Sequence, residues 1–249
     1  MDYTGRFSGR ADWYARYRPS YPARIISILR KEVGLDSRHT VADIGSGTGL
    51  LTRVFLENGN RVFGVEPNDS MRSYAERSLG PFRGFVSVKG TAEHTTLPNR
   101  SVDLVTAGLA LHWFDPSEAA KEFSRISKQG GTLCVVYNTR KNDRVGRAYE
   151  EIVSRYENDR AEVPDAEAGL IARFFKGGEY SKLEVPNEQS LDREGLLGRL
   201  LSASYMPRPV ERRKSAELRR DAATMFERFS SDGRLKLRYR TTIYFGRIP

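Results

Sequence analysis

Thr40-Val41-Ala42-Asp43-Ile44-Gly45-Ser46-Gly47-Thr48-Gly49-Leu50-Leu51 is the stretch that decides the fold. A short apolar run enters three alternating glycines, and an apolar helical pattern follows at once. Glycine has no Cβ and tolerates a positive φ, so such a turn lets a ligand lie against bare backbone. The start of the next helix points unpaired N–H groups at the same place. The stretch therefore predicts a strand, a ligand-binding turn and a helix.

A second strand pattern ends in an acid. The run Arg61-Val62-Phe63-Gly64-Val65 is followed directly by Glu66. In doubly wound sheets an acidic residue at this position, about 20 residues after the glycine turn, reaches the hydroxyls of a ribose. The two segments together predict a cofactor that carries a nucleoside.

The spacing of the glycines narrows the choice of cofactor. A dinucleotide fold uses G-x-G-x-x-G, but Leu50 stands where its third glycine belongs. A P-loop is excluded because no Gly-Lys-Ser/Thr follows. The carboxylate of Asp43 would repel phosphates, whereas it suits a ligand with an ammonium group. S-adenosylmethionine combines an ammonium, a carboxylate, a sulfonium and adenosine.

Four segments in order resemble the motifs of class I S-adenosylmethionine-dependent methyltransferases. They are Asp43–Gly49, Gly64–Met71, Gly90–Pro98 and Ser101–Phe114. The nearest subgroup is the methyltransferase type 11 kind, which includes trans-aconitate methyltransferase-like enzymes and is similar also in Tyr17-Arg18-Pro19-Ser20-Tyr21-Pro22. The resemblance is strong over about residues 7–140 and weak beyond them.

The resemblance implies a role for each site residue. The glycine turn and Asp43 would hold the methionine part of the cofactor, partly through water, and Arg18 would pair with its carboxylate. Glu66 would bind the ribose, while Ala92 and Glu93 would read the adenine edge. The full cofactor set is Arg18, Asp43, Gly45, Ser46, Gly47, Gly49, Glu66, Pro67, Met71, Ala92, Glu93 and Leu109, and the substrate set is Tyr14, Tyr21, His112, Trp113 and Arg140.

His112 is the candidate for an acid or base, because an unperturbed histidine titrates near neutrality. It lies where the family keeps residues that face the transferred methyl group. A role in packing or in shaping the substrate pocket stays open, because a carboxylate or tertiary amine acceptor needs no proton removed. The sequence has no His/Cys/Asp/Glu set with the spacing of metal ligands.

Alternating strand and helix patterns predict an α/β fold with a doubly wound, mostly parallel seven-stranded sheet and a helical lid insertion. The expected strands are 40–44, 61–65, 85–89, 102–106, 132–137, a strand around 182–186, and an edge strand over 235–247. The expected helices are 22–33, 50–58, 69–79, one from 115 to the glycines at 130–131, and 192–203. We expect one domain over 1–249, divided into an N-terminal lid and helix (1–34), a cofactor-binding core (35–139), a helical insertion over the substrate (140–178) and the remaining strands and helices of the sheet (179–249).

The composition of the chain indicates which cellular compartment and which partners to expect. The chain has 249 residues, a formal charge of +9 and one cysteine, Cys134, so no internal disulfide can form. We expect a cytoplasmic monomer or homodimer with no membrane segment, and a buried, unreactive Cys134. Most of the positive excess lies between Arg199 and Arg240, with twelve Lys or Arg against five Asp or Glu.

The expected methyl acceptor is a small molecule. The turn after the fourth strand, Ala107–Leu111, lacks the Asn/Asp-Pro-Pro-aromatic sequence typical of enzymes that methylate exocyclic amines of bases. Arginines near the expected lid would suit an anionic acceptor such as a carboxylate; these are Arg140, Arg144, Arg208 and Arg212. Two alternatives stay open: a protein that binds nucleic acid through its Arg-rich C-terminal part, and a nucleotide-dependent oxidoreductase.

Overall fold

A seven-stranded sheet runs through the computed structural model, which describes residues 11–158, 167–175, 179–207 and 212–248. The strand order is β3-β2-β1-β4-β5-β7-β6. The first five strands pair in parallel, whereas β7 is antiparallel to both β5 and β6. The expected mostly parallel, doubly wound sheet is confirmed. The strands are β1 (Thr40–Ile44), β2 (Arg61–Val65), β3 (Phe85–Val88), β4 (Val102–Gly108), β5 (Ser127–Arg140), β6 (Ser181–Leu191) and β7 (Leu235–Arg247).

Helices cover both faces of this sheet. One apolar cluster joins it to α2 (Arg24–Val33), α3 (Leu50–Glu57) and α4 (Asp69–Leu79). Another joins the opposite face to α5 (Pro116–Ile126) and α7 (Glu167–Phe174). The start of α5 follows from its sequence, because the Asp115 side chain accepts hydrogen bonds from the backbone N–H groups of Ser117 and Glu118.

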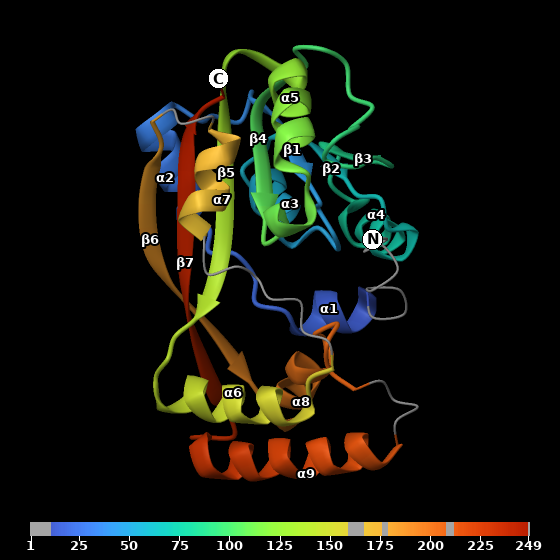
Figure 1. Cartoon of the computed structure of the whole chain (residues 1–249), viewed down its shortest axis with the longest axis vertical. Coiled ribbons are helices and arrows are strands. Elements are labelled where there is room, and N and C mark those ends of the chain that lie inside the picture. Colours follow the sequence, from blue (N-terminus) through green and yellow to red (C-terminus); the bar gives the residue numbers. More distant parts are fainter. Residues whose placement is uncertain (1–10, 159–166, 176–178, 208–211, 249) are drawn as a thin grey trace.

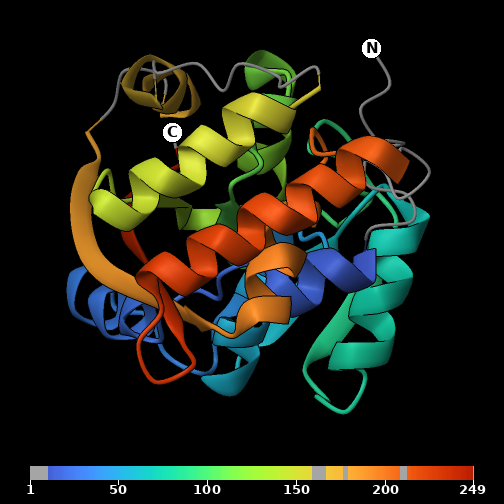
Figure 2. The ribbon, with the colours of Figure 1, turned by 90° about the horizontal axis from the view of Figure 1, so that it is seen from below.

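A third apolar cluster lies below the sheet and forms a separate helical layer (Figure 1). It contains α6 (Arg144–Tyr156), α8 (Arg193–Leu201) and α9 (Arg212–Phe229), together with the near ends of β6 and β7. Seen from below, α6 and α9 lie side by side across the molecule (Figure 2). The arrowheads of β4 and β5 point toward this layer, so it faces the carboxyl ends of the parallel strands (Figure 1).

The helical layer draws on more of the chain than residues 140–178. That segment supplies α6, but its second helix, α7, packs on α5 at the face of the sheet. Helices α8 and α9 come from beyond residue 178 and contact each other. We use "lid" below for α6, α8 and α9 together with α1 (Ala11–Tyr17), which contacts α8.

The contact between α1 and α8 is close. The Tyr17 ring lies against Gly198, where a Cβ would approach the ring to 2.4 Å. The Tyr17 hydroxyl donates a hydrogen bond of 2.9 Å to Glu194. Because residue 198 has no side chain, α1 lies directly on the backbone of α8.

The expected end of one helix and the expected edge position of the last strand are wrong. The helix that was expected to reach Gly130-Gly131 ends at Ile126, and β5 begins at Ser127. The register between β4 and β5 shifts here, since Val102 pairs with Ser127 but Leu104 pairs with Thr132. The glycines therefore lie in an irregular part of a strand, a common place for glycine in a sheet. The expected edge strand over 235–247 is an inner strand, and β6 forms the edge.

Within the described residues, none of the helices combines the length and apolar character that crossing a membrane requires. Cys134 is fully buried in β5, and burial raises the pKa of its thiol to about 12, in agreement with the expected unreactive side chain.

Candidate active site

The glycine turn follows β1 at the carboxyl edge of the sheet. The backbone N–H groups of Gly45 and Ser46 donate to the carbonyl oxygen of Val65, so the turn folds toward the end of β2. A hollow opens above it. It is lined by Tyr14, Tyr21, Asp43, Gly45, Ser46, Gly47, Thr48, Leu50, Leu51 and Gly108.

Two glycines of the turn differ in what surrounds them. Gly49 has φ +87°, and a Cβ there would lie 2.4 Å from Cδ1 of the buried Leu79, so core packing demands glycine. Gly47 has φ +58°, yet a Cβ there would meet nothing within 4 Å. Packing within the protein therefore does not explain the bare backbone at Gly47, which faces open space.

Glu66 joins the end of β2 to the glycine turn. Its Oε2 accepts a hydrogen bond of 2.9 Å from the Gly47 N–H, and its Oε1 accepts one of 2.8 Å from the Asn68 N–H. Burial raises the pKa of this carboxyl group, whereas the two backbone donors act in the opposite direction. Each oxygen keeps a further lone pair that can accept from a ligand hydroxyl.

Asp43 is fully buried at the end of β1. Its Oδ2 accepts a hydrogen bond of 2.6 Å from the Thr52 hydroxyl, whereas Oδ1 has no partner among the described residues. Burial raises the pKa of Asp43 to about 7. The Thr48 hydroxyl is also buried without a partner in the described part of the chain. Such orphaned polar atoms beside a hollow are suited to a polar ligand.

Four further residues of the expected cofactor set, Pro67, Met71, Ala92 and Glu93, follow Glu66 in the chain. Met71 and Ala92 are buried, and Pro67 is half-buried. Glu93 takes a different contact from the one that the resemblance implies, because its Oε1 accepts a hydrogen bond of 2.9 Å from the Asp115 N–H. Glu93 thus helps to fix the start of α5, and its expected contact with adenine stays a prediction.

Leu109 and His112 follow β4. Leu109 has φ +52°, an uncommon conformation for a leucine, and its N–H donates to the carbonyl oxygen of Val136. His112 is half-buried with its ring 4.5 Å from that of Trp113, and its Nδ1 has no partner among the described residues. Burial lowers the pKa of His112 to about 4, so the imidazole is neutral near pH 7.

The aromatic residues expected to bind substrate lie beside the cofactor turn, since Tyr14 and Tyr21 both line its hollow. The Arg18 guanidinium stacks over the Tyr14 ring at 4.9 Å, and its Nη2 donates to the carbonyl oxygen of Ser202. Arg140 lies apart from the turn, where it stacks on Tyr149 and forms an ion pair with Glu150.

Of the other arginines expected near the lid, Arg144 is the one whose side chain the structure describes. Arg144 is exposed and stacks over Phe229. Arg212 begins α9, and Arg208 lies outside the described residues.

Sequence reasoning missed three features of this edge. Thr48 lies inside the quoted turn, where its hydroxyl group was the only indication of a role in binding. Gly108 lines the hollow because β4 runs two residues further than expected. Arg199 is buried in α8, and nothing in the sequence indicated this, because it is one of 41 Lys and Arg residues.

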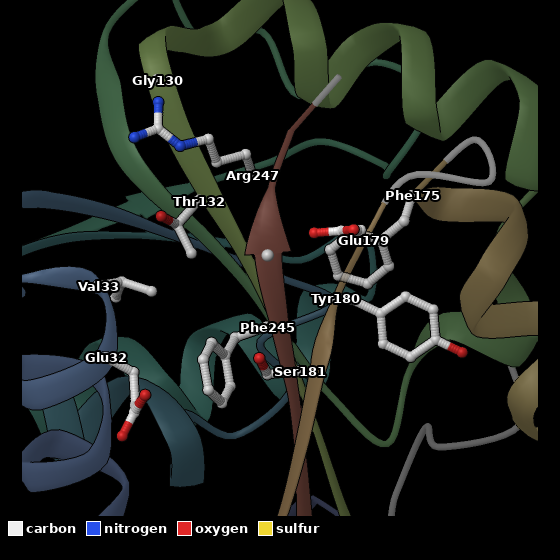
Figure 3. Close-up of a pocket in the computed structure, with 11 residues that line it drawn as sticks. Glu32, Val33, Gly130, Thr132, Phe175, Glu179, Tyr180, Ser181, Phe245 and Arg247 are labelled. Atoms are coloured by element: carbon white, nitrogen blue, oxygen red, sulfur yellow. The ribbon is translucent and has the colours of Figure 1, made fainter.

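A larger cavity of about 1130 Å³ lies at the opposite end of the sheet (Figure 3). It is bordered by the end of α2, the start of β6 and the end of β7, with Glu32, Glu179 and Arg247 among its side chains. None of the expected site residues lines this cavity. The volume of a cavity therefore does not by itself identify the active site.

Known methyltransferases are similar to this chain in sequence. Residues 42–135 match the family model of the methyltransferase domain. An uncharacterized methyltransferase of Mycobacterium tuberculosis is 37% identical over 151 residues, which cover 60% of this chain and 59% of the relative. The chain thus spans about three fifths of the length of the mycobacterial relatives that it matches. An uncharacterized methyltransferase-like protein of Schizosaccharomyces pombe is 29% identical over 93% of this chain and 91% of its own length.

Solved structures share the fold. A candidate type II methyltransferase from Anaeromyxobacter dehalogenans superposes with a TM-score of 0.69 at 22% identity, over 93% of this chain and 98% of that one. A SAM-dependent methyltransferase from Aquifex aeolicus gives a TM-score of 0.50 at 15% identity, over 74% and 92% of the two chains.

Residues 42–135 thus resemble a methyltransferase domain, and the sheet and its helices have the Rossmann-like fold of class I enzymes. The Aquifex aeolicus enzyme is a methyltransferase that depends on S-adenosylmethionine. The residues present fit that molecule: the unpartnered Asp43 Oδ1 can accept from its ammonium group, and the free lone pairs of Glu66 can accept from its ribose hydroxyls.

Proposed function

We propose that this protein transfers the methyl group of S-adenosylmethionine to a small-molecule acceptor that carries a carboxylate or a similar anion. The observation that carries the proposal is the hydrogen bond from the Gly47 N–H to Glu66. It joins the ends of β1 and β2 into one cradle, and the bare backbone of Gly47 lies open above it.

Each residue of the cradle has a separate task in this proposal. S-adenosylmethionine, when bound, supplies a sulfonium methyl group with a good leaving group. Asp43 and Thr48 hold the ammonium and carboxylate groups, and Glu66 holds the ribose. Arg18, at the end of α1, faces the same side and offers a guanidinium for the methionine carboxylate. The residues thereby fix the orientation of the methyl group, and orientation supplies most of the rate enhancement for such a displacement.

A carboxylate acceptor agrees with the chemistry of His112. With a pKa of about 4 this imidazole is a weak base near neutral pH. An acceptor that must lose a proton would gain little from it. A carboxylate is already deprotonated and needs no base, so His112 with Trp113 would shape the pocket around the acceptor.

The test begins with calorimetry. The purified protein is titrated with S-adenosylhomocysteine and, separately, with NAD. Binding of the first alone is the expected result, since Leu50 interrupts the dinucleotide pattern. Failure to bind S-adenosylhomocysteine would overturn the proposal and reopen the oxidoreductase alternative if NAD binds instead.

The acceptor class is tested with labelled methyl donor and a panel of small molecules. The panel contains carboxylates, including trans-aconitate, together with amines, phenols, duplex DNA and RNA. We expect label in the carboxylates. Label only in neutral or cationic compounds would remove the anionic part of the proposal. Label in nucleic acid, or salt-dependent binding to it without transfer to small molecules, would favour the nucleic-acid alternative.

A further inference from the structure

The lid contains a buried cation that has no anionic partner among the described residues. Arg199 lies in α8 with 5% of its surface exposed. None of the carboxylates in the described ranges forms an ion pair with it, and its Nη1 has no hydrogen-bond partner there. A buried charge is costly unless it is paired and fully hydrogen-bonded. The position of Arg199 therefore calls for an explanation beyond packing.

Tyrosines, which are neutral, surround this guanidinium. Its Nε donates a hydrogen bond of 3.2 Å to the Tyr239 hydroxyl, and its Cζ lies 5.7 Å from the centroid of the Tyr149 ring. Burial raises the pKa of Tyr149, so that hydroxyl stays protonated and offers no negative charge. The tyrosines orient the guanidinium without neutralising it.

Among the other partly buried arginines in the described part of the chain, three have acids beside them, whereas Arg18 forms no ion pair there. Arg72 pairs with Asp69, Arg125 pairs with Glu122, and Arg140 pairs with Glu150. Arg140 also stacks on the same tyrosine, Tyr149, as Arg199. Of the two arginines on this ring, Arg140 has a carboxylate partner, whereas Arg199 has none in the part of the chain that the structure describes.

A line of contacts connects Arg199 with the cofactor hollow. The Tyr14 ring lines the hollow and stacks under the guanidinium of Arg18. Arg18 in turn donates to the carbonyl oxygen of Ser202, whose hydroxyl donates to the carbonyl oxygen of Arg199. The Nε of Arg18 is itself buried and has no partner in the described ranges. These contacts connect the hollow to the backbone of α8 at Arg199, and the guanidinium groups of Arg18 and Arg199 each keep an unused donor in the described ranges.

We propose that Arg199 is the residue that recognises the acceptor, by binding its carboxylate. A guanidinium is suited to this task because its planar fork matches both oxygens of a carboxylate. Arg18, nearer to the hollow, serves the carboxylate of the methyl donor. This inference rests on the proposed function for the acceptor, but the contacts that support it are independent of the cofactor cradle.

The first experiment measures binding of carboxylates without any methyl transfer. Thermal unfolding is followed with citrate, trans-aconitate or phenylacetate at constant ionic strength, with sulfate, phosphate and the neutral amide of phenylacetate as comparisons. We expect saturable stabilisation of the wild-type protein by a carboxylate and none by its amide. Arg199→Met should abolish this stabilisation, and Arg199→Lys should retain part of it. Arg193→Met, on an exposed arginine of the same helix, is the matched control.

The melting temperature without ligand separates recognition from a structural role. Methionine fills a similar volume and removes the unpaired charge, so Arg199→Met should melt at the same temperature as the wild type or higher. A structural arginine would lower the melting temperature when replaced. In steady-state assays Arg199→Met should raise KM for a carboxylate acceptor roughly 10- to 100-fold, the range for a lost charged hydrogen bond. The Kd for S-adenosylhomocysteine should change less than about twofold.

Three results would overturn this proposal while leaving the proposed transfer reaction intact. They are wild-type stabilisation by sulfate or phosphate alone, equal stabilisation of the wild type and Arg199→Met by carboxylates, and a lower melting temperature for Arg199→Met with KM unchanged. Loss of S-adenosylhomocysteine binding by the wild type would instead count against the transferase activity itself.

Discussion

The cofactor cradle and the lid bury charges of opposite sign. At the ends of β1 and β2 the buried ionisable groups are acids, Asp43 and Glu66, and burial raises the pKa of each. In the lid the buried group is a base, Arg199, and no acid pairs with it in the described residues. Each region is thus complementary to a different ligand charge. The cradle suits hydroxyl and ammonium donors, whereas the lid suits an anion.

In our proposal, recognition of donor and acceptor is divided between these two regions, which have separate apolar clusters. Variants that affect one region and leave the other unchanged test this division. The predictions below run from the largest expected effect to the smallest.

Glu66→Ala should remove donor binding and leave the lid intact. The variant loses the acceptors of two ribose hydroxyls, and charged hydrogen bonds contribute about 1.5–3 kcal/mol each, so S-adenosylhomocysteine should bind at least about 100-fold more weakly. Calorimetry measures this change. Stabilisation by carboxylates should persist in the same variant, and its loss would contradict the division into two regions.

Comparing Gly49→Ala with Gly47→Ala separates a glycine that core packing requires from a glycine that faces the proposed ligand. Gly49→Ala should lower the free energy of unfolding by about 2–4 kcal/mol. The alanine would have to adopt a left-handed backbone conformation, and its Cβ would also clash with Leu79. Gly47→Ala adds only the strain, about 1–2 kcal/mol, but places a methyl group where the ligand lies. Urea denaturation gives the first quantity and calorimetry the second. Equal donor affinity for Gly47→Ala and the wild type would show that the open space is not the ligand site.

Asp43 should make donor binding depend on pH. Its carboxyl group, with a pKa of about 7, must ionise to pair with an ammonium group, so affinity for S-adenosylhomocysteine should rise by up to about tenfold per unit between pH 5.5 and 7. Asp43→Asn should flatten this profile. Calorimetry in buffers of different ionisation enthalpy should detect proton release for the wild type only.

The same carboxyl group has a signature in the free protein. Because the folded pKa lies above the unfolded value of 3.8, Asp43 stabilises the fold at low pH, and this contribution is lost as the pH rises toward 7. The stability of Asp43→Asn relative to the wild type should therefore increase from pH 4 to pH 8. A constant difference would contradict the raised pKa.

His112→Asn should have the smallest effect. If the acceptor needs no base, kcat should fall less than about tenfold, whereas loss of a general base costs 100-fold or more. The pH profile of kcat should be flat from pH 5.5 to 8, since the imidazole is neutral throughout this range. A profile with an ionisation near 6.5 that disappears in the variant would assign His112 a role as a base.

The strands and helices around the proposed cofactor site could largely be predicted from local sequence. The bounds of β1, β2 and α4 agree with the alternation and glycine signals of the sequence. The same patterns place Asp43, Gly47 and Glu66 at one edge, because the carboxyl ends of parallel strands meet there. The positive φ of Leu109 could not be predicted, since it arises from how the end of β4 meets β5.

The lid could not be predicted in the same way, because its contacts join segments far apart in the chain. Tyr17 binds Glu194, and Arg18 binds Ser202, at sequence separations of 177 and 184. The inner position of β7 likewise depends on pairing with β5 and β6 rather than on its own alternation. In sequence, Arg199 is one basic residue among many, and only the fold shows that it is buried.

The bare backbone at Gly198 has a consequence for how the two ligands communicate. Any side chain there would push the Tyr17 ring outward and would carry the neighbouring Arg18 with it. Arg18 spans the two regions, because it contacts Tyr14 at the hollow and Ser202 beside Arg199. Coupling between donor and acceptor binding would therefore depend on the absence of a side chain at Gly198. This residue lies on a helix more than 130 residues away in sequence from the glycine turn.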